Sequence, residues 1–200
     1  LFVISSPSGG GKTSLINKLF EDSRSANFEK SISDTSRQKR QGDLEGKDYY
    51  FLSEKDFRDK IKKEEYVEYA TVFGNFYGTS KEEIKTKYNN SNLILELDWQ
   101  GAYAVKELFD DAKLIFLVPP SLDDLKQRLI KRNLDSFEEI ENRLSEAKKE
   151  ISKSEMYDYL VLNDDFDKAF EDLSQILFEG ISPIDFSSRA SKDLIKRLVE

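Results

Sequence analysis

The sequence predicts an α/β fold in which helices flank a sheet of parallel strands. Short apolar runs, typical of buried strands, alternate along the 200 residues with longer runs whose apolar residues recur at helical spacing. A glycine-rich segment over residues 5–14 joins the first apolar run to the first amphipathic run, and phosphate-binding α/β proteins place such a loop between a strand and a helix. A chain of this length can bury a sizeable core in one compact domain.

The glycine-rich segment is the first element suited to chemistry. Its backbone N–H groups can turn inward around an anion, and the start of the next helix adds the positive end of its dipole. We expect Lys12 to reach the outer phosphates of a nucleotide and Thr13 to offer its hydroxyl to Mg²⁺. Ser6 stands where the pattern G-x-x-x-x-G-K-[ST] has its first glycine, and a flexible turn with an exposed lysine is the alternative. The expected nucleotide-binding residues are Ser8, Gly9, Gly10, Gly11, Lys12, Thr13 and Ser14.

The next stretch of the chain predicts strands separated by two helices. Ser53 marks a helix start with Phe57 on its buried face, and Ser80 with Glu83 forms the S-x-x-E capping-box pattern. Strands are expected over residues 28–33, 66–72 and 92–97, with a turn and short strand over 74–78.

The second half of the chain continues the alternation. Ser121 and Ser136 are expected to open two charged helices, the latter with a second capping box that includes Glu139. The remaining expected elements are helices over 101–109, 165–179 and 192–199 and strands over 113–118 and 157–162.

Composition excludes several classes of chemistry. The chain has no histidine and no cysteine, which rules out a histidine general base, a serine–histidine triad, disulfides and thiolate metal sites. Its net charge of −8 argues against a nucleic-acid partner, and no apolar run approaches the length of a membrane span. We therefore expect a cytoplasmic protein that acts on small molecules through arginines, lysines, carboxylates and hydroxyls.

Several short motifs follow the glycine-rich segment, in order, along nearly the whole chain. They are S-I-S-D-T-S-R-Q-K-R at 31–40, G-K-D-Y-Y-F at 46–51, E-Y-A at 68–70, G-N-F-Y-G-T at 74–79, L-D-W-Q-G at 97–101, P-P-S at 119–121, R-L at 128–129 and at 143–144, and the stretch 157–165. Together they resemble the guanylate kinase family. The resemblance implies a P-loop NTPase fold and ATP-dependent phosphorylation of GMP to GDP, with Mg²⁺ as cofactor. It also implies a single domain with a core of about 1–32, 81–121 and 157–185, a mixed α/β GMP-binding insertion of about 33–80, a helical lid of about 122–156 and a tail at 186–200.

The basic loop after the second strand suits an acceptor phosphate. Arg37 and Arg40 lie three residues apart, and planar guanidinium groups bind phosphate with two parallel hydrogen bonds. The resemblance implies that these arginines, with the hydroxyls of Tyr49 and Tyr77, hold the GMP phosphate. The alternative for two arginines in a loop is a solvated surface.

Guanine recognition calls for hydrogen-bond acceptors, because the base presents N1–H and an exocyclic amino group. The resemblance implies that Glu68 accepts from this edge with Asp98 close by, and that Ser33 and Thr79 bind other polar atoms of the base. The alternative for Glu68 is the solvent face of a half-buried strand.

The lid carries arginines that the resemblance implies are catalytic: Arg128, Arg132 and Arg143. They would swing over the phosphates as lid and insertion close over the substrates, and would neutralise charge on the transferring group. The alternative is a charged, solvated helix pair. Asn163 would lie near the adenine of ATP, or else is a turn residue before a helix cap at Asp164.

Two departures from the family pattern concern the site. Glu96 stands where relatives usually have aspartate, at the end of a strand that would face the magnesium ion, so its outer-shell role is a hypothesis. Asn133 stands where a glycine usually follows the lid arginine, and asparagine tolerates left-handed backbone.

The absence of histidine is compatible with this reaction. The acceptor phosphate has a second pKa of about 6 and needs no base at neutral pH, so alignment and charge stabilisation suffice. Two other functions stay open: a non-catalytic guanylate-kinase-like module that binds phosphopeptides, and a P-loop kinase for another phosphorylated acceptor such as a ribose phosphate. The retained Lys12 and Thr13 argue against the first, and Glu68 with Asp98 argues against the second.

Overall fold

The computed structural model describes residues 1–72, 74–132 and 136–200, without the side chain of Arg132, and it divides into two compact units. The first unit comprises residues 1–2 and 27–112, and the second comprises residues 3–26 and 113–200. The domain limits expected from the sequence stay predictions.

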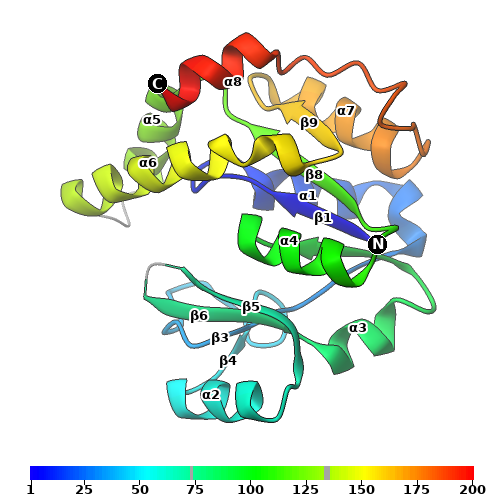
Figure 1. Ribbon diagram of the computed structural model, residues 1–200, viewed down its shortest axis with the longest axis vertical. Helices are drawn as coiled ribbons and strands as arrows, with labels where there is room; N and C mark the ends of the chain where they lie inside the picture. The colour runs from blue at the N-terminus through cyan, green and yellow to red at the C-terminus, as the bar shows by residue number, and fades with distance from the viewer. Residues whose placement is uncertain (73, 133–135) are drawn as a thin grey trace. The chain divides into compact units, whose positions relative to one another are not determined.

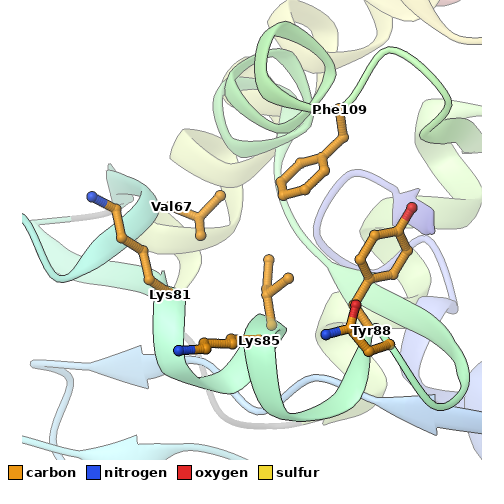
Figure 2. A pocket seen from close by; sticks show the side chains of 7 residues that line it. Val67, Lys81, Lys85, Tyr88 and Phe109 are labelled. Carbon is orange, nitrogen blue, oxygen red and sulfur yellow. The ribbon is translucent and has the colours of Figure 1, made fainter.

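A small four-stranded sheet dominates the first unit (Figure 1). Its strands lie in the order β4-β3-β6-β5, where β3 is Asp34–Thr35, β4 is Tyr50–Phe51, β5 is Tyr66–Val72 and β6 is Asn75–Ser80. Strands β5 and β6 are antiparallel and set Glu68 opposite Thr79. Helix α2 (Glu54–Lys62) packs on this sheet through Phe57, whose ring stacks on Tyr66 and Phe76 with centroid distances of 4.5 and 5.3 Å.

The rest of the first unit contains a parallel strand pair and two helices. Strand β2 (Phe28–Lys30) pairs in parallel with β7 (Asn92–Glu96), whose Leu93, Ile94 and Leu95 are fully buried. Helix α3 (Lys81–Lys87) continues directly from β6, and α4 (Trp99–Leu108) follows β7 and packs against β5.

The second unit is built on β1 (Phe2–Ser5), which lies beside β8 (Lys113–Val118), and β8 pairs in parallel with β9 (Tyr159–Leu162). Helix α1 (Lys12–Glu21) contacts α7 (Phe166–Leu177), while α6 (Phe137–Ser152) contacts both α5 (Leu122–Arg132) and α8 (Lys192–Val199) (Figure 1). Two 3₁₀ helices, η1 (Ser23–Asn27) and η2 (Ser154–Met156), complete the described elements. In the part of the chain that the structure describes, every helix is too short or too polar to cross a membrane.

Helix caps bear out most of the expected starts. Ser53 caps α2, and Ser136 with Glu139 forms the complete capping box at α6. The box predicted at Ser80 is only half formed: the Ser80 hydroxyl accepts from the Glu83 N–H, but the Glu83 carboxylate accepts from the N–H of Ile32 at 2.8 Å. The bond that does not form is the one from the Ser80 N–H to the Glu83 carboxylate, because Ser80 is the last residue of β6 and is paired with Tyr66.

Several boundaries differ from the sequence prediction; strand β9, for example, begins at Tyr159 rather than at residue 157. Helix α4 begins two residues earlier than expected because Asp98 caps it, accepting from Gly101 N–H at 2.9 Å. The cap of α7 is Asp165 rather than Asp164. Strand β2 ends at Lys30, three residues before the predicted end.

Candidate active site

The glycine-rich loop has the backbone that an anion site requires. Gly9 and Gly11 have φ values of 85° and 91°, a left-handed conformation that residues with a Cβ rarely adopt. The loop closes through a 2.8 Å hydrogen bond from Gly10 N–H to the carbonyl of Pro7. Gly11 caps α1, so the N–H groups of the first helical turn lie at the loop.

The side chains that we expect to bind phosphate and magnesium directly follow the loop. Lys12 and Thr13 are the first two residues of α1, and Thr13 and Ser14 are exposed. The buried face of the helix, formed by Leu15, Ile16 and Leu19, fixes it to the core. The predicted order of strand, glycine loop and helix is therefore confirmed.

Ser6, the departure from the glycine pattern, is accommodated by Gly10. A Cβ at Gly10 would lie 2.8 Å from the Ser6 Cβ and 2.8 Å from the Pro7 carbonyl oxygen. Position 10 thus has no room for a side chain, and the Ser6 hydroxyl donates to the Pro7 carbonyl at 3.2 Å.

Asn163 and Arg143 hydrogen-bond to this loop, and Arg128 Nη1 lies 3.8 Å from the position that a Cβ would take on Gly11. The Asn163 side-chain amide, which is buried, donates to the Gly10 carbonyl at 2.6 Å. The Asn163 backbone carbonyl accepts from Arg128 at 3.0 Å, and Arg143 donates to the Ser8 hydroxyl at 2.9 Å. The structure therefore brings two of the three predicted lid arginines to the loop. Arg132 is the last residue of α5 and its side chain is not among those described, while Asn133 lies outside the described residues altogether.

Glu68 lies in the first unit, where its carboxylate faces inward from β5. Only 5% of the residue is exposed, so the alternative of a solvent-facing strand position is wrong. Its Oε1 has no hydrogen-bond partner among the described residues. Burial raises the pKa of the Glu68 carboxyl to about 7, although hydrogen bonding from Thr79 acts in the opposite direction and the Asp98 charge adds to the rise.

The other predicted base-binding residues surround Glu68. Thr79, fully buried, lies opposite it on β6, and the Thr79 and Ser33 hydroxyl oxygens are 3.5 Å apart. Asp98 caps α4, and a Cβ built on Gly101 of that helix would lie 2.9 Å from Glu68 Oε2. The structure thus gathers all four residues in one place.

The predicted phosphate-binding residues form a second group in the same unit. The Tyr49 and Tyr77 rings meet edge to face at a centroid distance of 5.7 Å, and the Arg37 guanidinium lies 5.4 Å from the Tyr49 ring centroid. Burial raises the pKa of Tyr49 to about 12, so its hydroxyl stays a donor at neutral pH. Arg40 is exposed and joins the group through its backbone N–H, which donates to Asp43.

Glu96 forms an ion pair with Lys30 within the first unit. Its Oε1 lies 2.5 Å from the Lys30 ammonium, and its side chain is 16% exposed. The described residues contain no cluster of three or more carboxylates that could hold a metal ion by themselves. The roles of Thr13 and Glu96 toward a magnesium ion stay predictions.

Comparison with known proteins agrees with this arrangement. The family model described as Guanylate kinase matches residues 1–180. The chain belongs to the guanylate kinase family. The guanylate kinase of Hahella chejuensis (strain KCTC 2396) is 48% identical over 177 residues, which cover 88% of this chain and 84% of that protein. That of Wolbachia sp. subsp. Brugia malayi (strain TRS) is 46% identical over 179 residues, covering 88% and 91%.

The fold comparison points to the same family. The crystal structure of guanylate kinase from Anaplasma phagocytophilum matches with a TM-score of 0.73 and 33% identity, and the match covers 100% of this chain and 93% of that one. The predicted α/β class with the P-loop NTPase fold is therefore confirmed, as is the resemblance to the guanylate kinase family.

The sequence analysis did not identify two residues that contact members of the candidate site. Asp43 accepts from Arg37 at 2.9 Å and from the Arg40 N–H at 2.8 Å, and these hydrogen bonds lower the pKa of its carboxyl although burial alone would raise it. Lys30 pairs with Glu96. Asp43 could have been found, because it is an acidic residue three positions after Arg40. No local pattern connects Lys30 with Glu96, which lies 66 positions away.

The raised pKa of Glu68 predicts a pH-dependent change in stability. The neutral carboxyl favours the folded state at low pH, and this contribution is lost as pH rises from the usual glutamate range through about 7. Glu68→Gln stays neutral throughout, so the Tm of the variant minus that of the wild type should grow between pH 5 and pH 8. Calorimetric melts across this range provide the measurement, and a constant difference would mean that Glu68 is not titrating abnormally.

Proposed function

We propose that this chain transfers the γ-phosphoryl group of ATP to GMP, giving ADP and GDP. The observation that carries the proposal is the inward-facing carboxylate of Glu68, whose Oε1 is unpartnered among the described residues, set beside the Ser33 and Thr79 hydroxyls. A buried acceptor without a donor is costly unless a ligand supplies one. Guanine supplies two donors on one edge, N1–H and the exocyclic amino group.

The group around Arg37 suits the phosphate of the same nucleotide. Arg37 is held by Asp43 and bordered by Tyr49, so its guanidinium is oriented before a ligand arrives. The hydroxyls of Tyr49 and Tyr77 add donors beside it. A monophosphate with its base at Glu68 would thereby be fixed at both ends, as alignment for transfer requires.

The donor nucleotide belongs on the glycine loop. The backbone N–H groups of residues 9–13 and the Lys12 ammonium would bind the ATP phosphates, with Mg²⁺ on the Thr13 hydroxyl. When bound, the ion would neutralise phosphate charge. Arg143, at Ser8, and Arg128, at Asn163, would supply further positive charge to the transferring group. Asn163 would hold the loop through Gly10, in addition to the adenine contact that the family resemblance implies.

No residue need act as a general base, because a phosphate with a second pKa of about 6 is largely dianionic at neutral pH. The chain's own contribution is therefore positioning and charge stabilisation. A cytoplasmic location, in keeping with a chain without cysteine, is part of the proposal.

A screen of phosphate acceptors tests the proposed function. ADP formation from ATP should be fast with GMP and at least about a hundredfold slower with AMP or ribose 5-phosphate, because only guanine satisfies Glu68 with donors. Equal rates with all acceptors, or preference for ribose 5-phosphate, would overturn the assignment of GMP.

A further inference from the structure

Gly101 occupies the third position of helix α4 and is buried against Glu68. A Cβ built there would lie 2.9 Å from Glu68 Oε2, 3.3 Å from its Cδ and 3.1 Å from the Leu97 Cβ. Contacts this short require something to move. The φ of Gly101 is not in the left-handed region, so the backbone itself does not require glycine.

Glycine is also the unfavourable choice for this helix. Alanine has a higher helix propensity than glycine. The missing side chain therefore has a use other than helix formation, and the atoms nearest to the empty position are those of the Glu68 carboxylate.

We propose that Gly101 is a positioning residue that determines base specificity: the absence of a side chain at position 101 lets the Glu68 carboxylate lie where it can accept hydrogen bonds from the edge of guanine. This inference rests on the proposed function. Glu68 Oε2 lies 2.9 Å from the position that a Cβ would take on Gly101, and Oε1 is the oxygen without a hydrogen-bond partner among the described residues. The Gly101 N–H donates to Asp98, which caps α4. Gly101 therefore takes part in the helix cap and also lies next to the Glu68 carboxylate.

The Glu68 carboxylate has little freedom to evade an added methyl group. Glu68 is 5% exposed and lies opposite Thr79 in the pairing of β5 with β6. Hydrogen bonding from Thr79 also restrains the carboxylate. A methyl group at position 101 therefore displaces the carboxylate along the direction that leads away from α4. Misplacement of a recognition group by a fraction of an ångström weakens hydrogen bonds to the base and leaves the P-loop unaffected.

The test compares Gly101→Ala with Glu107→Ala, an exposed position on the same helix, by titration calorimetry and by steady-state kinetics. We expect Gly101→Ala to weaken GMP binding and lower kcat/KM for GMP by about tenfold, and to lower the GMP:AMP ratio. ATP affinity should stay within twofold of wild type. Glu107→Ala should behave as wild type in all four measurements.

A double-mutant cycle separates positioning from general damage. In a Glu68→Ala background, Gly101→Ala should change GMP binding by less than twofold, because the side chain that it positions is absent. Equal effects in both backgrounds, unchanged GMP affinity, or loss of ATP affinity together with GMP affinity would each overturn the proposal. If wild type binds GMP without forming GDP, the proposed function fails, whereas the calorimetric comparison still decides the role of Gly101.

Discussion

Lys12→Ala should abolish measurable turnover while leaving the protein folded. Lys12 is the first residue of α1, directly after the left-handed Gly11, and its ammonium is the charge that the loop can offer to the outer phosphates of ATP. Removing one positioned donor from a developing charge costs roughly 10²–10³-fold in rate, and removing a full charge costs at least as much. We therefore expect kcat to fall by at least about a thousandfold.

Lys18→Ala is the matched control, because Lys18 lies in the last turn of the same helix and makes only a 3.9 Å surface pair with Glu21 among the ion pairs described. Lys18→Ala should melt near the wild-type temperature, since an exposed lysine contributes little to stability, and Lys12→Ala should stay folded because Leu15, Ile16 and Leu19 form the buried face of α1. A folded Lys12→Ala variant with near-normal activity would mean that the glycine loop is not the site of ATP.

Glu68→Gln should change the choice of base. The substitution replaces one acceptor oxygen by an NH₂ donor, which faces the donors of guanine. Leaving a recognition donor unpaired costs roughly 1–3 kcal/mol, so kcat/KM for GMP should fall by about tenfold to a hundredfold. AMP should gain relative to GMP, because adenine offers a lone pair at N1 that the carboxylate repels.

The measurement is kcat/KM for GMP and AMP at saturating ATP, with Glu82→Gln, an exposed residue of α3, as the matched control. The KM for ATP should be unchanged, because Lys12 and the P-loop belong to the other compact unit. An unchanged GMP:AMP ratio would remove Glu68 from base selection and leave that role to Ser33, Thr79 and Asp98.

Much of the fold could be predicted because its signals are local. Apolar periodicity identified α7, and a serine followed by glutamate three residues later identified the box at α6. The same pattern misled at Ser80, where Glu83 binds Ile32 instead. A local motif cannot reveal a competing partner 51 residues away.

The candidate site likewise has features that could be predicted from the sequence and features that could not. The glycine loop could be identified by residue type and spacing, whereas Glu68 could be identified only through the family resemblance. The contacts that orient them could not be predicted, because they join distant parts of the chain: Asn163 to Gly10 across 153 positions, and Arg143 to Ser8 across 135. Side-chain packing also decided that Glu68 is buried and that Gly101 lies next to it, which no periodicity shows.

Transfer of a phosphoryl group from ATP to GMP can be tested by following the phosphorus atom. The protein is incubated with ATP labelled at the γ-phosphate, GMP and Mg²⁺, and the products are separated. We expect label in the β-phosphate of GDP, in an amount equal to the ADP formed and with little free phosphate. Label released as inorganic phosphate, or retained in ATP although GMP is bound, would contradict it.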